Sequence, residues 1–312
     1  MADGAGAAVA GRRARLSLPK PLHCLFLLLT WAPLSGAADI PLPQADGSEL
    51  RLPEPARRVV TLAPHLAEGA FAAGAGRQLV ATVAFSEYPA AAAELPRIGD
   101  AFRLDIERIT ALHPDLVIAW DSGNPRPAIE QLRLLGLAVW TVELREPLAI
   151  PEFIEAVGLA TGHRAEATAE ADRLRSRLAD LERRYAGAEP RTYFYQVDAK
   201  PLFTINGQHL ISRGLALCGG ANIFAAEPGL AFQVARESVI VANPDAMLAP
   251  RLPDADDPLA MWREWPGLAA VREQALFLLP ADEISRATPR FLDSLDTACK
   301  LLQGLRGQKT DG

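Results

Sequence analysis

The side chains that most often carry out chemistry are thinly spread along this 312-residue chain. No His-Glu-x-x-His segment and no closely spaced pair of cysteines occurs, although such spacings are typical of zinc sites. The glycine-rich lysine loop that cradles phosphates is absent, as is the Gly-x-Ser-x-Gly turn that presents a serine nucleophile. Gly74 and Gly76 follow an expected helix rather than a strand, unlike the glycines of a dinucleotide site. The absence of these motifs argues against an enzyme. A secreted enzyme with scattered catalytic residues is the alternative.

Residues 1–37 have the order of charges and apolar residues that is typical of a secretory signal peptide. A basic stretch at 11–20 precedes an apolar run at 22–31, and small residues follow at 35–38. The apolar run is about half of the roughly 20 residues that span a bilayer, so a membrane anchor is the less favoured alternative. We predict cleavage after Ala37 or Ala38 and export of the remaining chain to the periplasm.

Cysteine placement agrees with export. Cys24 lies in the predicted signal peptide, so removal of that peptide leaves Cys218 and Cys299. An even number of cysteines in an exported chain favours one disulfide, which is stable in an oxidising compartment. Two buried free thiols are the alternative, because a sequence does not show whether two Cα atoms come close enough. We predict the disulfide.

Composition limits the remaining classes. Hydrophobic residues make up 49% of the chain and charged residues 22%, enough for a packed core in one large or two ordinary domains. The 32 basic and 38 acidic residues give a net charge of −6, and several of the basic residues lie in the N-terminal segment. An acidic body argues against nucleic-acid binding, which needs a basic surface.

Short apolar runs alternate with helical patterns on both sides of one long helix. Before it, strands are expected at 59–63, 79–84, 115–119 and 138–142, with helices at 65–73, 105–112 and 127–135. After it, strands are expected at 191–197, 245–249 and 275–279, with helices near 209–217, 236–242, 261–274 and 289–305. This alternation predicts parallel sheets with helices on both faces.

The long helix is predicted at 163–186, where Gly and Pro are absent and apolar residues recur every three or four positions. Gly187 and Pro190 end it. At about 1.5 Å per residue it would reach roughly 36 Å, which is longer than one small domain needs. We therefore expect it to join two lobes.

The two halves of the chain resemble each other. LDIERITALHPDLVIA (104–119) aligns with VARESVIVANPDAMLA (234–249), which places Glu107, Pro114 and Asp115 opposite Glu237, Pro244 and Asp245. The sequence thus predicts an α/β protein with two similar parallel-sheet lobes and a ligand cleft between them. The expected parts are a signal peptide (1–37), an N-terminal extension (38–56), a first lobe (57–145), a connecting region (146–189), a second lobe (190–308) and a tail (309–312).

Four segments together resemble the class III periplasmic solute-binding proteins, the Fe/B12 periplasmic-binding family of ABC importers. They are RVVTLAPHLAEGAFAAGAG, FSEYP, LDIERITALHPDLVIAW and LCGGANIF, in a match that runs from about Arg57 to Leu305. The resemblance implies a monomeric, non-enzymatic carrier without a cofactor of its own, which delivers a small-molecule ligand to a membrane permease. Cobalamin (vitamin B12) is the expected ligand, and a ferric siderophore, haem or another metal chelate is the alternative.

The resemblance also places ligand-binding aromatics in the first lobe. Phe85, Tyr88 and Trp120 fall where cobalamin-binding members have cleft aromatics. A further such position is Ala101 here, with Phe102 beside it. Flat macrocycles are held well by aromatic faces, because rings bury a large area at little conformational cost.

In the second lobe the resemblance is weaker. Val197 and Ala231 stand where aromatics are expected, and Tyr195 and Phe232 lie beside them. We expect Tyr195 and Phe232 to bind the ligand.

Three more residues bear on the identity of the ligand. Haem-binding members carry an iron-binding Tyr where this chain has Asp100, which disfavours haem. Siderophore sites often use Arg, a role expected of Arg286, with Arg103 and Arg290 as alternatives. His65 follows the first strand and is a candidate imidazole ligand for cobalt or iron, although a loop histidine is more often simply solvated.

Glu107 and Glu237 match the two glutamates that, in the family, dock the lobes on arginine pockets of the permease. Two anions at equivalent repeat positions suit a two-fold symmetric cationic receiver. We expect both glutamates to contact the permease and neither to contact the ligand.

Overall fold

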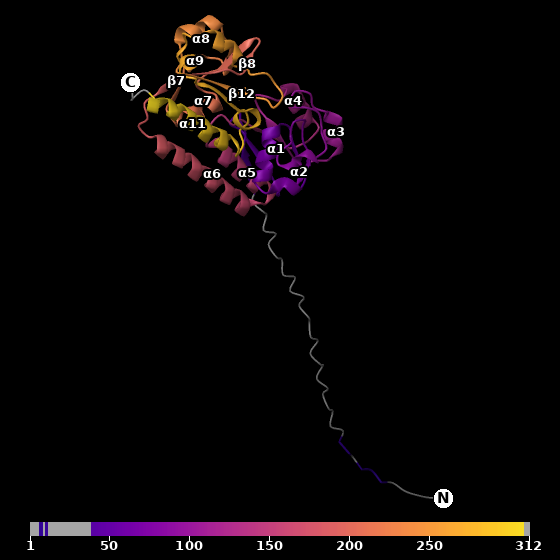
Figure 1. Ribbon diagram of the computed structural model, residues 1–312. Coiled ribbons are helices and arrows are strands. Elements are labelled where there is room, and N and C mark those ends of the chain that lie inside the picture. The colour runs from indigo at the N-terminus through magenta and orange to yellow at the C-terminus, as the bar shows by residue number, and fades with distance from the viewer. Residues whose placement is uncertain (1–5, 9, 12–38, 309–312) are drawn as a thin grey trace, which may run out of the picture. The chain divides into compact units, whose positions relative to one another are not determined.

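The computed structural model describes residues 6–8, 10, 11 and 39–308 (Figure 1). Most of the predicted signal peptide and the whole tail lie outside the described residues, so cleavage stays a prediction. Among the residues that the structure describes, no helix is both long and apolar enough to cross a bilayer. We use "first lobe" for 57–145 and "second lobe" for 190–308, boundaries that remain those predicted from sequence.

Each lobe is built on a four-stranded parallel sheet, and the two sheets have the same strand order. The first lobe has β4 (Leu79–Ala81), β3 (Val59–Thr61), β5 (Leu116–Trp120) and β6 (Val139–Val142), in that spatial order. The second has β10 (Gly220–Asn222), β7 (Arg191–Tyr195), β12 (Ala246–Arg251) and β13 (Leu276–Pro280). The predicted architecture of two similar α/β lobes is confirmed.

Helices follow the strands in both lobes (Figure 1). The first lobe contains α1 (Pro64–Ala72), η1 (Ala75–Arg77), α2 (Ala90–Ala93), α3 (Ile106–Ala111) and α4 (Arg126–Leu134). The second contains α7 (Leu210–Ala216), α8 (Arg236–Ala242), η2 (Ala260–Glu264), α9 (Ala269–Arg272), α10 (Ala281–Ile284) and α11 (Phe291–Gln308). The helix expected at 261–274 is two short pieces, because Pro266 and Gly267 interrupt it.

The first sheet buries both of its faces. Leu116 and Ile118 of β5 belong to a large core that continues into the second lobe. Val117 and Ala119 of the same strand point into a smaller core on the opposite face. Side chains alternate between the faces of a strand, so a strand buried on both faces is apolar throughout, as 115–119 nearly is.

The long helix appears where it was predicted. The connection contains α5 (Ala149–Thr161) and α6 (Arg164–Tyr185), and the apolar stripe of α6 is buried. Outside this stripe α6 reaches α11 of the second lobe, which lies beside it in Figure 1. Arg177 pairs with Asp293, and Arg184 pairs with Asp296, each at 2.6 Å. The helix therefore connects the lobes through the core and through surface ion pairs.

Two small antiparallel sheets were not predicted. The N-terminal extension forms a hairpin of β1 (Ile40–Pro43) and β2 (Glu49–Leu52), each only four residues long and the first with two prolines, too short for a clear strand pattern. The Trp140 Nε1–H donates to the Pro43 carbonyl at 2.8 Å and ties the hairpin to the first lobe. The second lobe adds a sheet of β8 (Asp198–Ala199), β9 (Leu202–Ile205) and β11 (Ala231–Gln233).

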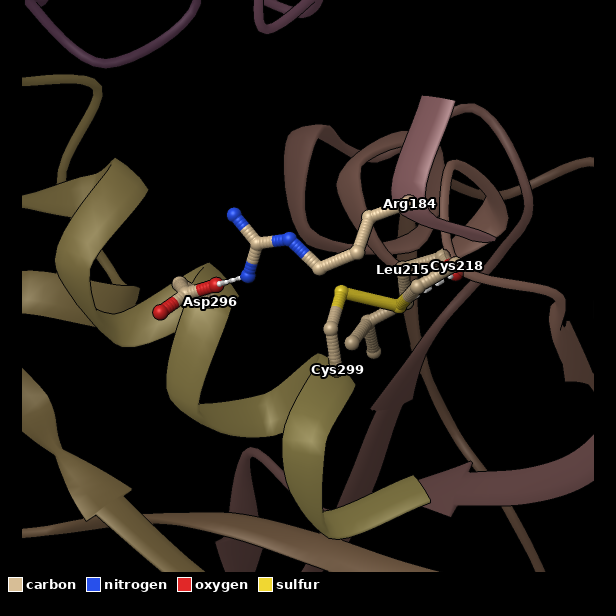
Figure 2. The surroundings of a disulfide bond; sticks show 5 residues. All are labelled: Arg184, Leu215, Cys218, Asp296 and Cys299. Atoms are coloured by element: carbon tan, nitrogen blue, oxygen red, sulfur yellow. Dashed lines mark hydrogen bonds and ion pairs between the residues drawn. A yellow bond between two sulfur atoms is a disulfide. The ribbon is translucent and has the colours of Figure 1, made fainter. Parts of the chain in front are cut away.

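The predicted disulfide is confirmed (Figure 2). Cys218, just after α7, bonds to Cys299 on α11, and their Cα atoms lie 5.5 Å apart. Both side chains are fully buried, and because they are bonded to each other the alternative of two free thiols is wrong. The bond fixes two helices of the second lobe to each other.

Candidate ligand-binding cleft

A cavity of about 420 Å³ lies between the lobes. The first lobe contributes segments that follow its parallel strands, and the second lobe contributes the start of α7 and the turn after α10. Loops at the carboxyl ends of parallel strands are the usual ligand sites of α/β folds. The predicted cleft is therefore present in the expected place.

The wall from the first lobe is aromatic. Phe85 and Phe102 line the cavity with 68% and 69% of their surfaces exposed. Phe85 has a φ of 65°, a left-handed backbone that is uncommon for a bulky residue. Asp100 accepts hydrogen bonds from the backbone N–H groups of Phe102 and Arg103, each at 2.8 Å, and so shapes the turn that carries Phe102.

Trp120 is the third aromatic of this wall and ends β5. A Cβ atom on Gly123 would lie 1.9 Å from the indole, so any larger residue here would displace Trp120. Asn124 accepts the Trp120 backbone N–H at 2.7 Å. Its Nδ2 donates to the carbonyls of Leu62 and Ala101, at 2.9 and 2.8 Å. One buried amide thereby joins three segments of the cleft.

The wall from the second lobe is mixed, with polar groups and Leu210 and Leu230. Arg286 lines it and pairs with Asp282, one helical turn earlier, at 2.7 Å. His209 precedes α7, and its Nδ1 accepts the Ile211 backbone N–H at 3.2 Å. Burial, with a smaller contribution from the charge of Arg145, lowers the pKa of His209 to about 4. Its imidazole is neutral at neutral pH.

His65 stands in the first turn of α1 and also lines the cavity, although its side chain is only 8% exposed. Its ring meets the Trp120 ring edge to face, with centroids 5.2 Å apart. Burial, followed by the charge of Arg286, lowers the pKa of His65 to about 4. His65 is therefore buried and neutral, not solvated.

Three of the predicted ligand-binding residues do not line this cavity. Tyr195 is 1% exposed and is packed in the core of the second lobe, because β7 is a central strand of its sheet. Phe232 lies on β11 and packs edge to face against Phe224, with centroids 6.0 Å apart. Tyr88 borders a second cavity of about 410 Å³. The structure therefore places these three residues off the cavity that Phe85, Phe102 and Trp120 line.

An ion pair between the two lobes lines the second cavity. Glu68 on α1 is buried and accepts two hydrogen bonds from Arg290, at 2.9 and 2.6 Å. The guanidinium of Arg290 also lies 4.0 Å from the centroid of the Tyr88 ring. Arg290, an alternative ligand-binding residue in the sequence analysis, thus joins the two lobes.

Glu107 and Glu237 lie away from both cavities. Each is exposed in the first turn of a short helix, α3 and α8 respectively. Within the described part of the chain, neither forms an ion pair with another residue. Both carboxylates are therefore open to a partner.

Sequence reasoning did not single out His209, Arg145 or Asn124 for the cleft. The sequence around His209 could have indicated its place at the start of a helix, because it precedes an apolar helical run and follows an Asn-Gly turn. No comparable signal marked the other two. In the described residues, no group of three or more His, Cys, Asp or Glu side chains could hold a metal ion.

Two parallel-sheet lobes, a long connecting helix and a cleft with one aromatic wall define a two-lobed ligand-binding protein. Residues 59–283 match the periplasmic binding protein family, and the chain belongs to this family. The match covers most of both lobes.

The relatives that the chain resembles include vitamin B12-binding proteins. It is 38% identical to the one from Vibrio cholerae serotype O1 over 257 residues, which are 82% of this chain and 92% of the relative. It is 34% identical to the one from Yersinia pestis over 271 residues, 85% of this chain and 95% of the relative.

Among solved structures, the crystal structure of the periplasmic vitamin B12 binding protein BtuF of Vibrio cholerae matches with a TM-score of 0.75 and 37% identity. The match covers 81% of this chain and 98% of that one. The periplasmic heme binding protein HutB of Vibrio cholerae matches with a TM-score of 0.68 at 21% identity, covering 78% of this chain and 98% of that one. At that identity HutB shares the fold alone.

Proposed function

We propose that this protein is the periplasmic binding component of an ABC importer, and that it captures cobalamin without catalysing a reaction on it. The observation that carries the proposal is the aromatic wall of Phe85, Phe102 and Trp120, which faces the space between the lobes. Exposed rings on a rigid lobe suit a broad, flat macrocycle. The vitamin B12-binding relatives named above support the same ligand.

A ferric siderophore or haem carrier is the second candidate. Arg145 and Arg286 both line the cavity, and arginine is suited to the carboxylates and other anionic groups of such chelates. The residue after Gly99 is Asp100, whose carboxylate is engaged with the backbone N–H groups of its own turn. We rank this candidate below cobalamin because the aromatic wall can bind the flat face of a macrocycle without any charged group on the ligand.

Calorimetric titration separates the candidates. The protein without residues 1–37 is titrated with cyanocobalamin, haemin and a panel of ferric siderophores. We expect saturable binding of cyanocobalamin with a stoichiometry of one. Saturation by another member of the panel alone would transfer the proposal to that ligand, and the absence of saturable binding by all of them would end it.

Delivery forms the second half of the proposal. We propose that the signal peptide directs export, that the mature chain is a monomer in the periplasm, and that Glu107 and Glu237 dock it on the membrane permease. The two exposed carboxylates lie at equivalent positions of two similar lobes. A receiver made of two related subunits would meet both at once.

A further inference from the structure

The His65 imidazole is a buried polar ring without a hydrogen-bonding partner. It is 8% exposed, it borders the cavity, and no hydrogen bond to its ring nitrogens occurs within the described residues. Neither ring nitrogen is among the fully buried unpaired side-chain atoms of the described residues, so both are accessible, and the ring borders the cavity where a ligand atom can bind it. Trp120 holds the ring edge to face, and Pro64 at the start of α1 restricts the backbone before it.

His209 provides the contrast within the same cavity. Its Nδ1 accepts the Ile211 backbone N–H, so the proton of the neutral ring is on Nε2. That nitrogen can only donate a hydrogen bond, and it has no lone pair for a metal. His65 carries no such constraint, and either of its nitrogens can be the unprotonated one.

We propose that a ring nitrogen of His65 binds the cobalt of the captured corrinoid at its exchangeable axial position. The inference rests on the proposed function, and it names a narrower ligand class. The site then prefers corrinoids whose axial ligand is labile, such as aquocobalamin, over those whose axial ligand is held firmly, such as cyanocobalamin.

The step is a ligand exchange. The lone pair of the imidazole forms a cobalt–nitrogen bond, the bond between cobalt and its water breaks, and the water leaves as a neutral molecule. Cobalt stays Co(III), and no proton or electron is transferred. The lowered pKa of His65 suits this exchange, because the ring is already neutral at neutral pH and no proton has to be removed first.

The visible absorption spectrum of the bound corrinoid reports the exchange directly. Wild-type protein, His65→Gln and His113→Gln are each saturated with aquocobalamin, and the spectra are compared with that of the free ligand. His113 is exposed and lines neither cavity, so it serves as the matched control. We expect an imidazole-type shift in the wild type and in His113→Gln, and none in His65→Gln. We also expect the wild type to bind aquocobalamin at least about tenfold more tightly than cyanocobalamin, a preference that His65→Gln loses.

A measurement on the wild type alone guards against a variant that fails to fold. Water bound to a metal ion loses a proton as the pH rises, and aquocobalamin changes its spectrum when this happens. A cobalt whose water has been replaced by His65 shows no such transition. We therefore expect saturated wild-type protein to lack the alkaline spectral change of the free ligand.

Two results would overturn the inference while leaving the proposed function in place. One is saturable binding of cyanocobalamin together with an unshifted aquocobalamin spectrum that keeps its alkaline transition. The other is a spectral shift that persists in His65→Gln. Failure of both corrinoids to bind would instead remove the proposed function, and this inference with it.

Discussion

The two lobes share a unit whose structural residues recur and whose cavity-lining residues do not. In each, a residue with left-handed φ follows a short helix within two positions, His113 at 45° after α3 and Asn243 at 44° after α8. A buried proline follows, and then an aspartate that accepts a backbone N–H from the start of the neighbouring strand. The strand ends differ, because Trp120 of β5 corresponds to Pro250 of β12 in the repeat. Residues that build the unit are repeated, and the cavity-lining residue Trp120 is not.

The difference extends to the aromatic residues of the lobes. Phe85 and Phe102 of the first lobe are exposed on the cleft. In the second lobe, Tyr195 and Trp262 are buried in the core, where the Trp262 indole N–H donates to Gln196 at 2.7 Å. The cleft therefore has one aromatic wall and one mixed wall, although the two sheets have the same order. Similar folding units can thus contribute different kinds of residues to one cavity.

The largest effect is expected where the lobes are equivalent, at Glu107 and Glu237. Reversing both charges to Lys places like charges against the proposed permease pockets, which costs several kcal/mol, and uptake should fall roughly a hundredfold or more. The loss should be sharpest at low salt, because screening weakens charge repulsion. The measurement is cobalamin uptake in reconstituted vesicles, with calorimetric ligand affinity nearly unchanged.

The matched control reverses Glu130 and Glu189, two other exposed glutamates, and makes the same change in net charge. Normal uptake by this control is expected. Normal uptake by the Glu107→Lys/Glu237→Lys variant would mean that these residues only complement the helix N-termini. A loss caused by one single reversal but not the other would show that the lobes dock unequally.

The next effect tests a feature that the second lobe alone possesses. Cys218 and Cys299 are 81 residues apart in sequence, and replacing both by Ala should lower the free energy of unfolding by about 4 kcal/mol. Urea unfolding of the oxidised protein and the variant measures the difference. Mass spectrometry of the unreduced protein should show it two hydrogens lighter than after reduction, and an unchanged mass would contradict the bond.

The third effect concerns the aromatic wall. Trp120→Ala should weaken cobalamin binding by about 1–3 kcal/mol, because aromatic residues in a binding site typically contribute that much. Trp265, 39% exposed on the second lobe and outside the cleft, serves as the control, and its replacement by Ala should leave affinity unchanged. Global unfolding of Trp120→Ala, detected by circular dichroism, would show instead that Trp120 belongs to the core.

The same contrast explains what the sequence could predict. The long helix α6, the strand β5 and the repeat were predictable because periodic apolar patterns reflect burial within one element. Whether an aromatic faces the cleft or the core depends on how whole elements pack, and so Tyr195 was misplaced while Phe102 was not. The pair of Glu68 and Arg290 is 222 residues apart, and no local pattern joins them.

The smallest effect tests the aspartates that the two units share. Asp115 accepts the backbone N–H groups of Arg57 and Arg58, at 2.8 and 2.9 Å. Asp245 accepts the Thr192 backbone N–H at 3.1 Å and its hydroxyl at 3.0 Å. Replacing either by Ala removes two charge-assisted hydrogen bonds beside a central strand, and Asp245 also loses its ion pair with Arg191 at 3.9 Å. Each replacement should lower the free energy of unfolding by about 1–2 kcal/mol, with Asp245→Ala at the upper end.

Because the two aspartates receive hydrogen bonds from different strands in different lobes, their effects should add in the double variant to within about 0.5 kcal/mol. Urea unfolding of the wild type, both single variants and the double variant measures the coupling. Equal and additive losses would mean that the repeated carboxylate does the same structural work in each lobe. Asp115→Ala could instead be neutral while Asp245→Ala lowers the free energy of unfolding. The two aspartates would then be equivalent in sequence and backbone position but not in their contribution to stability.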